Sequence, residues 1–151
     1  MEEQYLNLIK QAGALLSITK DLTANMANLS ALVYQNVKGL NWAGFYLLKG
    51  DKLVLGPFQG KPACVLIDLG RGVCGTAAQK GQTILVEDVH NFAGHIACDS
   101  ASNSEIVVPL FTPEKKLYGV MDIDSPLFNR FGEKEKQLFE TLAQTLTEKS
   151  F

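Results

Sequence analysis

Residues 41–58 read NWAGFYLLKGDKLVLGPF, and they change the pattern of the chain from a helical period to a period of two. Two short runs of aromatic and aliphatic residues, 41–48 and 53–58, are typical of half-buried strands. The link between them carries Gly50 and Asp51, which favour the tight turn of a β-hairpin. This stretch therefore predicts two antiparallel strands.

The segments on either side extend this pattern. Further strands are predicted at 64–68, 83–87, 105–112 and 116–124. Helical spacing of apolar residues predicts two helices within 1–40, a short one at 72–80 and a last one within 127–149. We expect an α+β domain spanning 1–151, with the sheet and its site loops at 41–126 and helices packed on one side of an antiparallel sheet.

Local signals predict where the second helix begins and ends. Asp21 or Thr23 can accept the hydrogen bond of an N-cap. Gly39 is placed to end this helix in a left-handed conformation.

Composition narrows the classes of function. The chain has 151 residues, 14 Lys and Arg against 16 Asp and Glu, and a formal net charge of −2. This balance supplies no basic surface, so nucleic acid and membranes are not expected partners. No apolar run approaches the ~18 residues of a membrane span, and residues 1–4 lack the pattern of a secretory signal. We expect a cytoplasmic protein.

The three cysteines are an odd number and do not suggest a disulfide scaffold. In a reducing compartment they are core residues, metal ligands or reactive thiols. Cys98 lies in a polar segment that also carries both histidines, His90 and His95. Neighbouring cations or N–H donors lower the pKa of a thiol and make it nucleophilic, so Cys98 is the first candidate for a reactive cysteine.

The other two cysteines lie in different settings. Cys64 begins a predicted strand at the edge of the sheet. Cys74 lies in the glycine-rich turn 70–76, where the start of a helix would lower the pKa of its thiol, although a small core residue is an equal alternative. A phosphate loop is excluded because no Gly-Lys-Ser/Thr follows. Zinc is disfavoured because no C-x-x-C pair is present, and no metal is expected.

Acidic and aromatic residues share strand faces. Asp122 and Asp124 alternate with apolar residues, so their repelling carboxyls point the same way. They suggest an ammonium site or an acid kept neutral for proton donation, or else a solvated strand end. Glu105 opens the preceding strand. Trp42 and Tyr46 share a face that is either core or a wall for an apolar or thioether group.

Several segments, in order along the chain, resemble the free methionine-(R)-sulfoxide reductases. They are 41–46, 55–64, 70–78, 94–102, 104–110 and 119–126. The resemblance implies a single GAF-like domain, with an antiparallel sheet of about six strands flanked by helices. It also implies reduction of the free R epimer of methionine sulfoxide, with no resident cofactor. Thioredoxin and NADPH would supply the electrons, and the resemblance is compatible with a homodimer.

The resemblance assigns roles to particular cysteines. Cys98 would be the nucleophile, Cys64 the resolving thiol, and Cys74 a second thiol able to form or exchange a disulfide.

It also assigns a binding pocket. Trp42 and Tyr46 would wall it, while Glu105, Asp122 and Asp124 would hold the amino group and supply a proton. The alternative is a GAF domain that senses a small molecule or thiol oxidation without catalysis.

Overall fold

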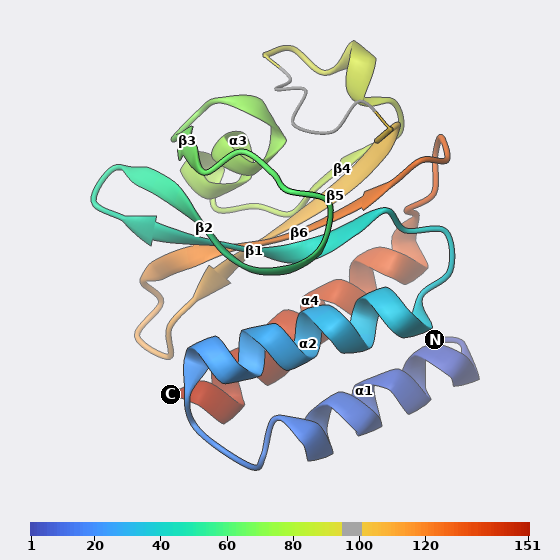
Figure 1. Cartoon of the computed structure of the whole chain (residues 1–151), viewed down its shortest axis with the longest axis vertical. Helices are drawn as coiled ribbons and strands as arrows, with labels where there is room; N and C mark the ends of the chain where they lie inside the picture. Colours follow the sequence, from blue (N-terminus) through green and yellow to red (C-terminus); the bar gives the residue numbers. More distant parts are fainter. Residues whose placement is uncertain (95–100) are drawn as a thin grey trace.

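The computed structural model describes residues 1–94 and 101–151, in which the helices at both ends of the chain lie on one face of a central sheet (Figure 1). In chain order the elements are α1 (Glu3–Leu15), α2 (Leu22–Asn36), β1 (Trp42–Lys49), β2 (Lys52–Gly60), β3 (Leu66–Asp68), α3 (Gly72–Lys80), β4 (Ile84–Val86), the 3₁₀ turn η1 (Val89–Asn91), β5 (Ser104–Phe111), β6 (Leu117–Ser125) and α4 (Glu133–Ser150). Within the described ranges, no helix combines the length and the apolar character needed to cross a membrane.

The six strands form one antiparallel sheet in the order β3-β2-β1-β6-β5-β4. Helices α1, α2 and α4 cover one face, and α3 lies on the opposite face (Figure 1). The predicted α+β class and antiparallel sheet are confirmed. The expectation that the helices pack on one side only is wrong, because β1 is buried on both of its faces from Trp42 to Tyr46 and the second face also needs a cover.

The period of two in β1 divides the apolar side chains between two cores. Phe45 points toward α1, α2 and α4, and packs in the larger core with Met121 and Ile123 of β6. Its neighbour Tyr46 points toward α3, and packs in the smaller core with Val107 of β5. One strand therefore serves both layers.

The ends of α2 decide between the alternatives offered by the sequence. Asp21 is the N-cap, because its Oδ1 accepts a hydrogen bond from Ala24 N at 2.9 Å. Gly39 has a left-handed φ of +78°, as predicted. However, α2 already ends at Asn36 and Val37 is extended, so Gly39 shapes the turn into β1 rather than the helix end.

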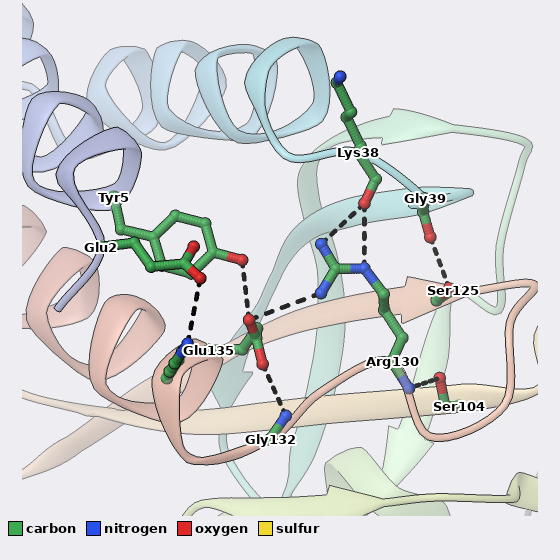
Figure 2. A network of polar contacts seen from close by, with 10 residues as sticks. Glu2, Tyr5, Lys38, Gly39, Ser104, Ser125, Arg130, Gly132 and Glu135 are labelled. Carbon is green, nitrogen blue, oxygen red and sulfur yellow. Dashed lines mark hydrogen bonds and ion pairs between the residues drawn. The ribbon is translucent and has the colours of Figure 1, made fainter.

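A polar network around Arg130 ties the connection between β6 and α4 to three other elements (Figure 2). Its guanidinium donates from Nε and Nη2 to Lys38 O, at 3.1 and 2.9 Å. Nη1 lies 3.7 Å from Oε2 of Glu135, which also accepts from Tyr5 Oη at 2.8 Å. The backbone N–H of Arg130 donates to Ser104 Oγ at 3.3 Å. The start of β5 is thereby fixed against the helical layer.

Most predicted boundaries shift by one or two residues in the structure, and α4 begins only at Glu133 and ends at Ser150, against the predicted range 127–149. The strand predicted at 64–68 begins only at Leu66, so Cys64 lies in the connection that precedes β3. The polar segment after β4 contains the turn η1 and ends where β5 starts at Ser104. By contrast, α3 has the bounds that the sequence predicted.

Gly44 of β1 allows a close approach of β2, and its replacement tests that constraint. A Cβ at Gly44 would lie 2.3 Å from Phe58 Cβ. We expect Gly44→Ala to force the two strands apart and lower the free energy of unfolding by about 1–3 kcal/mol, measured by urea denaturation.

The matched control for this substitution is Gly13→Ala in α1. A Cβ at Gly13 would meet nothing within 4 Å, so the variant should gain about 0.5–1 kcal/mol of stability. Equal effects of the two substitutions would show that steric approach does not limit position 44.

Candidate active site

The acidic residues singled out by the sequence lie in register with Trp42 on one face of the sheet. Trp42 pairs with Asp124, and Asp124 pairs with Glu105 across β1, β6 and β5. One step along, Gly44 pairs with Asp122. Paired residues of antiparallel strands point to the same face, so these side chains form adjacent rows. This is the face that α3 covers.

A cavity of about 50 Å³ lies between these rows and the segment that enters α3. Its lining includes the predicted binding residues and one predicted thiol: Trp42, Tyr46, Cys74, Glu105, Asp122 and Asp124. Glu105 and Asp122 are only 7% and 6% exposed. The structure therefore brings the predicted acids and rings around a single buried space.

Trp42 and Tyr46 wall this cavity and also hold the segment that precedes β3. Their rings are stacked, with centroids 6.0 Å apart. Trp42 Nε1 donates to Lys61 O at 3.0 Å, and Tyr46 Oη donates to Cys64 O at 2.9 Å. Burial, followed by the charge of Asp122, raises the pKa of the Tyr46 hydroxyl, so it keeps its proton and remains a donor. The aromatic wall is thus bonded to the backbone at Cys64.

The surroundings of Glu105 keep its carboxyl neutral. Burial, and after it the charges of Asp122 and Asp124, raises the pKa of Glu105 well above its usual range. The sequence predicts that repulsion between the two aspartates keeps one acid protonated. In the structure their charges add to the effect of burial on Glu105 and favour its protonated form, which is the form that a proton donor needs.

Cys74 is a free thiol in the first turn of α3 and is 5% exposed. Its Sγ lies 4.0 Å from Glu105 Oε2. Burial, followed by the charge of Asp122, raises the pKa of this thiol well above its usual range. The expectation that the helix start lowers this pKa is wrong, because desolvation and neighbouring carboxyls outweigh the helix dipole. Its role as a second exchanging thiol stays a prediction.

Of the other cysteines and the histidines, Cys64 and His90 are less buried than Cys74, and the other two are not among the residues that the structure describes. Cys64 is disulfide-bonded and half-buried. Cys98 and His95 lie outside the described residues. The side chain of His90 on η1 is 59% exposed, and its Nδ1 lies 2.8 Å from Asp88 Oδ1. Activation of Cys98 by a histidine therefore stays a prediction.

One group of side chains has the composition of a metal site. Within the described ranges, Cys74, Glu105 and Asp122 each offer a ligand atom within 4.8 Å of the others. This group differs from the zinc ligand set that the sequence suggests and disfavours, which consists of the three cysteines and the two histidines. Metal binding requires deprotonated ligands. Because the pKa values of the Cys74 thiol and the Glu105 carboxyl are raised, metal binding there would have to release protons. The expectation that the protein holds no metal stays a prediction.

Two lining residues with polar side chains, Arg71 and Ser102, are not among the site residues predicted from the sequence. Arg71 is exposed and lies at the rim of the cavity, between Gly70 and Gly72, which have φ of +83° and +62°. The glycines on both sides of Arg71 could have pointed to this residue in the sequence, because their backbone conformations suit few other residues and fix the turn that carries it. Ser102 also lines the cavity and accepts from Asn41 Nδ2 at 3.1 Å. Its position in a polar segment gave no signal.

Comparison with known proteins identifies the class to which this fold and site belong. The family model for the GAF domain matches residues 23–148. This match covers most of the chain, which therefore belongs to the GAF-domain family.

Similarity to individual proteins narrows the assignment. The free methionine-R-sulfoxide reductase of Escherichia coli (strain K12) is 52% identical over 144 residues, which are 95% of this chain and 87% of that protein. The structure of fRMsr of Staphylococcus aureus in complex with substrate has a TM-score of 0.92 and 46% identity, covering 97% of this chain and 95% of the other. Free methionine-R-sulfoxide reductase from Neisseria meningitidis, in complex with its substrate, has a TM-score of 0.93 and 40% identity, covering 99% and 91%. Within the GAF-domain family, the chain belongs to the free methionine-(R)-sulfoxide reductases.

The raised pKa of Glu105 predicts a pH dependence of stability. The unfolded chain releases this proton near the ordinary glutamate pKa of about 4.3, whereas the folded protein retains it to higher pH. The free energy of unfolding contributed by Glu105 therefore falls as pH rises above that value. We expect Glu105→Gln, which cannot ionise, to lose less stability than the unmodified protein between about pH 5 and about pH 8, measured by urea denaturation.

The control is Glu114→Gln in the exposed turn between β5 and β6, which removes the same charge from a different setting. It should retain the pH dependence of the unmodified protein. The same dependence in all three proteins would contradict the shift at Glu105.

Proposed function

We propose that this chain reduces free L-methionine-(R)-sulfoxide to methionine. The observation that carries the proposal is the buried cavity, in which two stacked rings face three carboxyls. Its mixture of apolar and acidic walls suits the two ends of an amino acid with an apolar side chain. The 52% identity to the Escherichia coli enzyme supports this assignment.

In the proposed complex, the aromatic and the acidic walls of the cavity contact opposite ends of the substrate. The apolar methyl and thioether end packs on Trp42 and Tyr46. The ammonium group pairs with Asp122 and Asp124, and Arg71 at the rim is placed to meet the carboxylate. A methionine sulfoxide within a peptide carries neither charge, so this arrangement selects the free amino acid.

The chemistry joins a thiolate to a proton donor. The thiolate of Cys98 attacks the sulfoxide sulfur while Glu105 protonates the oxygen. Transfer of the resulting hydroxyl to Cys98 releases methionine and leaves a sulfenic acid. The Cys64 thiol then attacks the Cys98 sulfur, which forms a disulfide and releases the oxygen as water. The disulfide-bonded state of Cys64 fits the product of that step.

Recycling requires an external dithiol. Thioredoxin reduces the disulfide by thiol–disulfide exchange, and NADPH supplies the electrons through the thioredoxin system. The proposed cycle therefore needs no resident cofactor. It also fits a cytoplasmic location, where thiols are kept reduced.

The cysteine roles are tested by separating the first turnover from steady-state turnover. Cys98→Ser should release no methionine even in the first turnover. Cys64→Ser should release about one methionine per site and then fail to recycle with thioredoxin, because the thiol proposed to resolve the sulfenic acid has been removed. Methionine release and thioredoxin-dependent NADPH oxidation measure the two steps.

The same assay separates an enzyme from a thiol redox sensor. A sensor would undergo one stoichiometric oxidation without accumulating methionine, and that result would exclude the proposed activity. Equal loss of the first turnover in both cysteine variants would contradict the roles of Cys98 and Cys64.

The acidic wall predicts discrimination against a blocked amino group. N-acetyl-methionine-(R)-sulfoxide lacks the ammonium charge, so its kcat/KM should fall by about a hundredfold relative to the free amino acid. Asp122→Asn removes part of the acidic wall, and this variant should discriminate less between the two substrates. Comparable rates on both substrates with the unmodified protein would refute ammonium recognition.

A further inference from the structure

We propose that the exposed apolar pair Val65 and Leu66 is the surface on which the protein dithiol reductant docks. The pair directly follows Cys64 at the edge of the sheet. This inference rests on the proposed function, because it concerns how the disulfide is recycled.

The exposure of these side chains is the first observation. Val65 and Leu66 are each 60% exposed, although both are aliphatic. Single exposed apolar residues are common on protein surfaces and need no explanation. Two exposed aliphatic residues directly after a half-cystine call for an explanation, because any protein that attacks Cys64 must cover the residues next to it.

The backbone of this segment is held in place, which is the second observation. Trp42 and Tyr46 donate to carbonyls of the residues that precede Val65, as described above. Leu55 N donates to Val65 O at 2.9 Å. The exposed side chains are therefore carried on an anchored segment. A partner that binds there loses little free energy in ordering it.

The position of β3 in the sheet is the third observation. In the part of the chain that the structure describes, β3 pairs with β2 alone and forms an edge of the sheet (Figure 1). An edge strand presents backbone groups that an extended segment of a partner can bond. Apolar side chains and a strand edge thus adjoin the sulfur that must react.

The exchange step places the reductant over Cys64. A thiolate of the reductant attacks Cys64 Sγ, which forms a mixed disulfide and releases Cys98 as a thiolate. The second thiol of the reductant then attacks its own neighbouring sulfur, which releases Cys64. The protein disulfide is reduced to two thiols, and the dithiol is oxidised to a disulfide. Throughout both steps the reductant remains in contact with Val65 and Leu66.

The test compares a protein reductant with a small one. In the variant Val65→Ser with Leu66→Ser, the KM for thioredoxin should rise about tenfold, because apolar side chains at the centre of an interface carry much of the affinity. Turnover driven by dithiothreitol should not change, since a small dithiol needs no docking surface. NADPH oxidation measures the first reaction, and methionine release measures the second.

The chain offers a matched control. Leu127 and Phe128 form another adjacent apolar pair, 52% and 59% exposed, between β6 and α4. Replacing both by serine should leave the KM for thioredoxin unchanged. A rise of KM in this control but not in the Val65 and Leu66 variant would overturn the proposal and place docking elsewhere.

The remaining outcomes separate the docking surface from the proposed function. If the unmodified protein releases no methionine with dithiothreitol, the proposed function fails. If it does release methionine and the KM for thioredoxin stays within about twofold in the Val65 and Leu66 variant, the docking surface is refuted. A parallel loss with dithiothreitol also refutes it, because the defect then lies in the protein's own chemistry.

A trapping experiment identifies the sulfur that is attacked. A thioredoxin whose second active-site cysteine is replaced by serine stops at the mixed disulfide. Mass spectrometry of the trapped complex should locate the bond at Cys64. A bond at Cys98 would overturn the proposed docking geometry.

Discussion

The constraint that governs this site is the burial of Glu105 beside two other carboxyls. Charges of like sign cannot all persist side by side in a space nearly free of water, because each loses solvation and repels the others. The site can be stabilised by a bound proton or by a cation that enters the cavity. In the structure the pKa of Glu105 is raised, which corresponds to the first of these. In the proposed mechanism the same grouping binds an ammonium group and provides a proton donor.

The architecture of the smaller core maintains this constraint. The first turn of α3 closes over the acidic rows, and Gly75 allows it to do so, because a Cβ there would lie 2.4 Å from Asp68 O. Gly119 of β6 likewise approaches β1, where a Cβ would lie 2.3 Å from Tyr46 O. The larger core beneath α1, α2 and α4 contains the greater share of the buried apolar side chains. Stability and chemistry are thus distributed between the two faces of one sheet.

Local periodicity was sufficient for much of the fold but not for the cross-strand arrangement. The period of two placed Asp122 and Asp124 on one face, and the helical pattern gave the bounds of α3. The pairing of Asp124 with Glu105 depends on a register between two strands, which spacing within either strand does not determine. The expectation that all helices pack on one side fails at α3, because spacing within a helix does not show which face of the sheet it covers. The thiol of Cys74 was misjudged because a helix start is visible in a sequence, whereas the depth of burial is not.

The hydrogen bond from Tyr46 to Cys64 O has a consequence for the order of events. One side chain lines the cavity and also donates a hydrogen bond to the backbone of a half-cystine. A ligand in the cavity that displaces the Tyr46 ring would also shift the Cys64 backbone, because the two are joined by this hydrogen bond. In the proposed cycle the two half-reactions therefore share a mechanical linkage, so the departure of one product can set the position from which the second sulfur acts.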